Sequence, residues 1–220
     1  MSFDINEAVF DEEGTYLEEP ALRYEAALMA QFAASPEGQA ITETGTELGW
    51  AGAMIHYAIT YPGVTPPTMT TSDLEAVVYD LFPRKVITEP GDGAEIIQEL
   101  HAFWRFLHRA YHLPRAPQML ARLTPQAAAR LERKLQAPRN FGLAKSFVLL
   151  GKEAGFDMES PEGMRAWVEA YNTTVAPMLA AATRRRGSPT NKQSRGGSTG
   201  TRNAPRRKQR RPRPSERREP

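Results

Sequence analysis

The residues with the clearest capacity for chemistry are arginines at the C-terminal end of the chain. Between Thr183 and Pro220 there are fourteen Lys/Arg residues and two Glu residues, a net charge of +12. Guanidinium groups present paired N–H donors that match the oxygens of a phosphate. The side chains expected to bind a polyanion are Arg184, Arg185, Arg186, Arg206, Arg207, Lys208, Arg210, Arg211 and Arg213.

This basic segment predicts binding to RNA, DNA or another polyanion without base specificity. Arginines in a flexible tail recognise charge rather than base edges, and no aromatic residue lies among them to stack on a base. If the tail contacts about eight phosphates of duplex DNA, the logarithm of the association constant should fall with the logarithm of the salt concentration with a slope of about −7. The alternative is a solubilising extension without a dedicated ligand. Composition favours polyanion binding and this alternative equally.

Three histidines lie in one predicted helix, at His101, His108 and His112. The motif HRAYH has the i, i+4 spacing with which two imidazoles can share a metal ion. It lacks a neighbouring glutamate, however, and Arg105 and Arg109 would repel a cation. Packing at the border of an apolar face is therefore the favoured interpretation, and neither metal nor cofactor is predicted.

Other candidate sites have ordinary structural explanations. Gly91-Asp92-Gly93 has the composition of an anion-binding nest, but a helix cap by Asp92 explains it better. Arg84 and Lys85 form the only adjacent basic pair in an acidic stretch, where a carboxylate cluster or a ligand would meet them. No nucleophile elbow, phosphate-binding loop or dinucleotide fingerprint is present, so an enzyme has no support beyond the histidines.

The pattern of helix starts and stops predicts an all-α fold, a single bundle of about eight helices. Cap and breaker residues place one helix after Pro20 and one after Ser35. The first has apolar positions at helical spacing, Leu22, Ala26, Met29 and Phe32. The further helices are expected over 50–61, from a capping box at Ser72 to near Pro83, over 94–112, 118–123, 125–135 and 143–154, and after Ser160. The helix over 94–112 has the broadest apolar face, formed by Ile96, Ile97, Leu100, Phe103, Trp104, Leu107 and Tyr111. In the last helix the expected inward residues are Trp167, Val168, Tyr171 and Val175.

Composition divides the chain into an acidic, partly ordered segment over 1–17, a helical domain over 18–182 and a disordered Arg-rich tail over 183–220. The tail has no Leu, Ile, Val, Phe, Tyr or Trp with which to build a core. The rest of the chain has a net charge of −10, and residues 1–95 hold seventeen Asp/Glu against three Lys/Arg. This opposite charge leaves open a tail that folds back on its own body.

Several features predict a cytoplasmic protein that does not enter a membrane. The chain has no cysteine, its first residues lack the pattern of a signal peptide, and no stretch is apolar over eighteen residues.

Five segments resemble an uncharacterised bacterial all-helical family whose members often carry a C-terminal SEC-C-type zinc motif. They are SPEGQAI, GWAGAMIHYAITYPGVT, LFPRKVITEP, ELHAFWRFLHRAYHLPRAPQML and NFGLAKSFVLLGKEAGFD. The resemblance covers roughly residues 35–171 and implies a bacterial cytosolic protein without any particular activity. The residues Arg202-Asn203-Ala204-Pro205 are similar to those that precede the first zinc cysteine, but Arg206-Arg207-Lys208 follows. Without thiolates, zinc binding does not carry over.

Together these observations predict a non-enzymatic helical interaction module with a basic tail that binds nucleic acid or another polyanion. The alternative is a protein–protein adaptor that acts through its helical body, with the tail secondary or latched onto that body.

Overall fold

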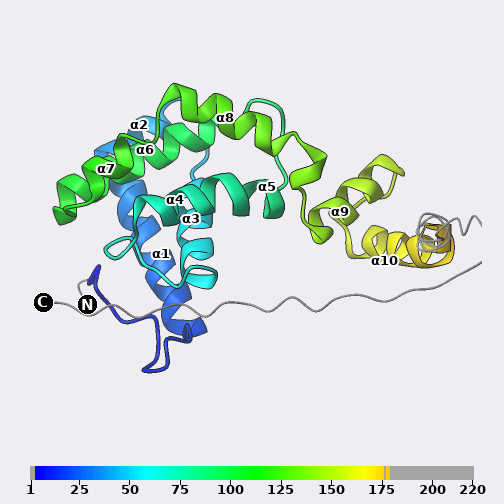
Figure 1. The fold of residues 1–220 in the computed structure, drawn as a ribbon, viewed down its shortest axis with the longest axis horizontal. Helices are drawn as coiled ribbons and strands as arrows, with labels where there is room; N and C mark the ends of the chain where they lie inside the picture. Colours follow the sequence, from blue (N-terminus) through cyan, green and yellow to red (C-terminus); the bar gives the residue numbers. More distant parts are fainter. Residues whose placement is uncertain (1–2, 176, 179–220) are drawn as a thin grey trace, which may run out of the picture. The chain divides into compact units, whose positions relative to one another are not determined.

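The computed structural model describes residues 3–175 and 177–178, and in that range the regular elements are helices joined by loops (Figure 1). One isolated β-bridge, between Phe10 and Tyr16, closes a turn near the N-terminus, and the described residues contain no strand. The prediction of an all-α fold is therefore confirmed. The α-helices are α1 (Glu18–Ala34), α2 (Pro36–Thr42), α3 (Trp50–Thr60), α4 (Thr71–Ala76), α5 (Phe82–Lys85), α6 (Asp92–Tyr111), α7 (Ala116–Leu120), α8 (Pro125–Leu135), α9 (Leu143–Glu153) and α10 (Pro161–Ala170).

Three shorter helical turns complete the element order. They are the π-helices η1 (Val77–Leu81) and η3 (Tyr171–Val175) and the 3₁₀ turn η2 (Pro138–Asn140). The chain up to Ala170 forms one compact unit, and η3 begins a second unit, most of which lies outside the described residues. The predicted disordered tail, 183–220, lies there too, and so do all the arginines expected to bind a polyanion.

Side-chain caps begin several helices where the sequence predicts them, with one displacement. Ser35 and Thr124 accept hydrogen bonds from the N–H groups of Gly38 and Ala127. The predicted capping box at Ser72 is wrong, because the helix begins two residues earlier. Thr70 is the cap, and Asp73 completes a reciprocal box by accepting from the Thr70 N–H at 2.8 Å. Ser72 lies inside α4 instead.

The helix that starts at Thr71 continues through a π-turn to Lys85, past Pro83. In η1 the Phe82 N–H donates to the Val77 carbonyl five residues back. Pro83 has no N–H, so the Tyr79 carbonyl receives no donor from the normal helical position. The Nζ of Lys134, in α8, donates to that carbonyl at 2.9 Å. A lysine from another helix thus replaces the hydrogen bond that the proline removes.

The core lies around α6, which contacts α2, α3, α7 and α8 and runs beside α8 (Figure 1). Most of the predicted apolar face of α6 is buried, although Tyr111 is only half-buried. The apolar positions predicted for α1 are only partly confirmed: Phe32 is in the core and Met29 packs against it, but Leu22 is 56% exposed. The other buried residues of this helix are Ala21, Tyr24 and Leu28. The N-terminal segment determines this choice, because Ile5 and Val9 join the core and the Tyr24 hydroxyl donates to the Ile5 carbonyl.

The last two helices of the first unit, α9 and α10, pack through a small aromatic cluster of their own. Trp167 is buried against Phe147 and Phe156, and its indole N–H donates to the Phe147 carbonyl at 2.9 Å. The prediction that Val168 points inward is wrong, because it is 43% exposed, whereas the neighbouring Trp167 is 3% exposed. Tyr171 is half-buried, and the side chain of Val175 lies outside the described residues.

No helix in the part of the chain that the structure describes is both long enough and apolar enough to cross a membrane.

Candidate functional site

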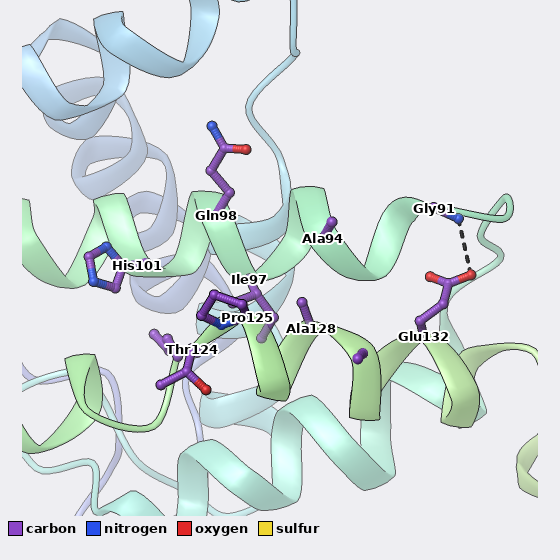
Figure 2. Close-up of a pocket in the computed structure, with 11 residues that line it drawn as sticks. Gly91, Ala94, Ile97, Gln98, His101, Thr124, Pro125, Ala128 and Glu132 are labelled. Carbon is purple, nitrogen blue, oxygen red and sulfur yellow. Dashed lines mark hydrogen bonds between the residues drawn. The ribbon is translucent and has the colours of Figure 1, made fainter.

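A groove of about 680 Å³ lies between α6 and α8. We call this cavity the α6–α8 groove. Its walls are mostly apolar, and Ile97 and Ala128 point into the space between the two helices (Figure 2). Its volume is in the range of cavities that hold small ligands. Its two titratable lining residues, His101 and Glu132, lie near opposite ends (Figure 2).

At one end of the groove the carboxylate of Glu132 caps the N-terminus of α6. It accepts hydrogen bonds from the Gly91 and Gly93 N–H groups, each at 3.0 Å (Figure 2 shows the first). The prediction that Asp92 caps this helix is wrong, since its carboxylate accepts from the Glu89 N–H instead. The alternative interpretation of Gly91-Asp92-Gly93, an anion-binding nest, fits these contacts better, and the anion that it binds is a carboxylate of the protein itself.

The close approach of the two helices explains the glycine at position 93. A Cβ atom there would lie 2.9 Å from the backbone nitrogen of Glu132 and 3.0 Å from its Cα. A side chain would therefore push α8 away from α6. Only glycine leaves room for the carboxylate to reach the helix end at this distance.

The other end of the groove contains His101, a half-buried residue on the ridge between two cavities. The second cavity, of about 300 Å³, lies between α2 and α6 and shares His101 and Gln98 with the groove. Burial lowers the pKa of His101, and the charge of Arg105 lowers it further. His101 is therefore a neutral hydrogen-bonding group at pH 7, which agrees with the predicted position at the border of the apolar face.

The other two histidines are not brought to the groove. His108 is exposed, and His112 ends α6 in the left-handed conformation, with φ of 53°. Among residues 3–175 and 177–178, no three His, Cys, Asp or Glu side chains are placed to hold a metal ion.

A second interhelical cap, formed by Glu99, was missed by sequence reasoning. This carboxylate of α6 is fully buried and caps the N-terminus of α3, where it accepts from the N–H groups of Gly49 at 3.0 Å and Ala51 at 2.8 Å. Burial raises its pKa, while these backbone hydrogen bonds act in the opposite direction. The signal in the sequence is its position three residues after Ile96 and four before Phe103, on the apolar face.

A smaller polar cavity of about 400 Å³ lies where α5, α8 and η2 meet, and we call it the basic pocket. It is lined by Tyr79, Asp80, Arg84, Lys134, Arg139, Asn140 and Phe141. Arg84 was predicted to meet a carboxylate cluster or a ligand, and here it shares a cavity with two other basic side chains. Lys85 points elsewhere, with its ammonium 4.9 Å from the centre of the Tyr61 ring.

These cavities differ in what they can bind. The α6–α8 groove offers apolar walls with one neutral imidazole and one carboxylate already bound to backbone N–H groups, so it suits an apolar group. The basic pocket suits an anion. The nine basic residues selected from the sequence, Arg184 to Arg213, lie outside the described residues, and their placement in space stays untested.

Comparisons with models of protein families, with curated proteins and with solved structures gave no match to this chain. The resemblance to the bacterial family with a SEC-C-type zinc motif therefore remains a prediction.

Proposed function

We propose that this protein is a non-enzymatic helical module that binds nucleic acid or another polyanion through its arginine-rich C-terminal segment. The observation that carries the proposal is the charge of +12 between Thr183 and Pro220, without a bulky apolar side chain in that segment. Such a segment gains binding free energy mainly by releasing counterions from phosphates. The contacts are assigned to Arg184–Arg186 and to the cluster from Arg206 to Arg213.

The described helices support a binding module more than an enzyme. The two titratable groups that line the α6–α8 groove lie near its opposite ends, and one of them, Glu132, accepts two backbone hydrogen bonds. A general acid and base that act on one substrate must both reach its reacting atoms. We place this function in the cytoplasm, with which a chain free of cysteine is compatible.

The second candidate function is a protein–protein adaptor, and the α6–α8 groove is the observation that favours it. An apolar groove of about 680 Å³ along two helices can accept the side chains of a partner. In this case binding would depend on the groove and would change little with salt.

Salt dependence separates the two functions. In the full-length protein, Arg206, Arg207, Lys208, Arg210, Arg211 and Arg213 are replaced together by glutamine, and binding to a nonspecific DNA duplex is measured by fluorescence anisotropy at rising salt. We expect the native chain to show a log–log slope of about −7 and the variant a slope shallower by about 5.

The matched control keeps the composition of residues 183–220 but scrambles their order, and it should bind as the native chain does, because charge rather than sequence is recognised. Equal, salt-insensitive binding by the native chain and the glutamine variant would reject the proposal.

A further inference from the structure

The basic pocket has an excess of positive charge that the protein itself does not neutralise. Three of its lining residues are cationic, Arg84, Lys134 and Arg139, and one is anionic, Asp80. Asp80 forms an ion pair with Lys134, whose Nζ lies 3.1 Å from its Oδ1. Within the described residues, the side chains of Arg84 and Arg139 have no carboxylate partner.

A fourth cation lies next to the pocket. The guanidinium of Arg130 stacks over the ring of Tyr79, with its central carbon 3.9 Å from the ring centroid. The stacked guanidinium adds to the positive potential around the Tyr79 side of the pocket. Glu75 also lies within electrostatic reach of Tyr79, but it forms an ion pair with Arg122. The lining of the pocket itself has three cations and one carboxylate, so an anionic ligand would restore the balance.

The backbone around the pocket is held by one contact between distant parts of the chain and one local contact. The Gly142 N–H donates to the Arg84 carbonyl at 3.0 Å, and the Asn140 side chain donates to the Lys134 carbonyl at 3.0 Å. A Cβ atom on Gly142 would lie 2.7 Å from the Arg84 carbonyl oxygen, so this approach requires glycine. These contacts place α5, α8 and η2 before any ligand binds, which lowers the entropic cost of binding.

The buried Lys145 side chain, in α9, contacts both the end of α8 and Phe141 of the pocket. It is 4% exposed, its ammonium lies 4.2 Å from the centre of the Phe141 ring, and its Nζ donates to the Leu135 carbonyl at the end of α8. Phe141 is thus held as a wall of the pocket. Its ring and the ring of Tyr79 give the pocket aromatic surface beside its cationic groups.

We propose that the basic pocket binds a phosphate group through the guanidinium groups of Arg84 and Arg139, with Lys134 adding positive charge. Guanidinium forks match phosphate oxygens, and an aromatic wall beside them suits the sugar or base attached to a phosphate. This inference deepens the proposed function and rests on it, since it adds a fixed phosphate contact on the helical body to the contacts of the C-terminal segment. A free phosphate has the same chemistry, so the two sources need separate probes.

The test follows backbone and side-chain amide NMR signals of the full-length protein during two titrations. The probes are inorganic phosphate and a 5′-phosphorylated thymidine tetranucleotide. We expect saturable shifts of the Asn140 and Gly142 signals, which report on the pocket and not on residues 183–220. Replacing Arg84 and Arg139 together by glutamine should weaken this binding by about tenfold or more, because two charge-assisted hydrogen-bonding groups are lost.

Three further variants make the result specific. Arg165→Gln removes an exposed arginine of α10, paired with Glu162, and should leave the pocket shifts unchanged. The double replacement of Arg84 and Arg139 by lysine keeps the charge but loses the fork, and it should give intermediate affinity. The six-residue glutamine variant of the C-terminal segment should keep the pocket shifts, so that failure of the proposed function and failure of the pocket are distinguished.

The outcomes are decisive in each direction. Shifts with both probes support the pocket as a general phosphate site, and shifts with the tetranucleotide alone support it as a nucleic-acid contact. The absence of saturable shifts with both probes, or shifts that persist in the double glutamine variant with an unchanged melting temperature, would overturn the inference.

Discussion

Two glutamates of this protein have the same task in different surroundings. Glu99 from α6 caps the N-terminus of α3, and Glu132 from α8 caps the N-terminus of α6, each through two backbone N–H groups. Glu99 is fully buried, whereas Glu132 is half-buried at the end of the α6–α8 groove. The hydrogen-bond geometry is nearly the same, so the difference in burial should determine how much each carboxylate stabilises the fold.

The two caps also show that helices of this protein depend on one another for their hydrogen bonds. The side chain that caps α3 comes from α6, and the side chain that caps α6 comes from α8. The N-termini of α3 and α6 are thus capped only when a helix from later in the chain, α6 or α8, is in place. This arrangement couples the three helices more tightly than local caps would, because losing one contact exposes backbone groups of another helix.

The largest effect is expected for Glu99→Ala. The Ala51 N–H, which is buried, and the Gly49 N–H would both lose their acceptor, and a cavity would remain where the buried carboxylate was. The free energy of unfolding should fall by about 3 kcal/mol. Urea denaturation followed by circular dichroism measures this, with Glu95→Ala, an exposed acidic residue of the same helix, as the control. A loss no greater than that of the control would contradict the role of Glu99.

A smaller effect is expected for Glu132→Ala. Water can reach the Gly91 N–H once the carboxylate is gone, so the loss should resemble that of an ordinary N-cap, about 1 kcal/mol. Glu132→Gln keeps one oxygen acceptor and should lose less. The same denaturation experiment tests both variants. If Glu132→Ala cost as much as Glu99→Ala, burial would not be the property that separates the two caps.

The smallest effect concerns pH. Burial raises the pKa of Glu99 above its unfolded value of about 4.3. The folded state then holds this proton to higher pH than the unfolded state does. The stability that this group contributes is therefore complete below the unfolded pKa and is lost as pH rises through the folded pKa.

The Glu99→Gln variant lacks this titration, so its free energy of unfolding should decline less than that of the native protein as pH rises above about 4.3. Chemical denaturation at several pH values between 4 and 8 measures the two curves. Parallel curves would show that Glu99 titrates with the same pKa in both states.

The sequence predicts the helices well where the signal is local. Ser35 and Thr124 cap helices as expected, and α8 covers the predicted residues. Errors arise where two local patterns compete. The choice between Ser72 and Thr70 as a cap is one case. The choice between the Leu22 and Ala21 faces of α1 is another, because both have helical spacing and only the N-terminal segment covers one of them.

The candidate sites show the same difference between local signals, which the sequence reveals, and contacts between distant helices, which it does not. The sequence identified Arg84 and His101 as candidates, but it did not bring Arg84 together with Arg139, which lies more than fifty residues later. It also missed Glu132 as the occupant of the nest at Gly91 and Gly93. These contacts depend on which helices become neighbours, and residue spacing within one helix carries no information about that.

By itself the sequence determined the all-α fold, the positions of most helix ends and the separation of negative charge from the basic C-terminal segment. These properties depend on composition and on interactions within a few residues. Only the tertiary structure decided which charged side chain satisfies each helix end and where the cationic groups gather. Glu99, Glu132 and Lys134 act on backbone groups 39 to 55 residues away, and such pairs form only when burial of the apolar faces fixes the helices side by side.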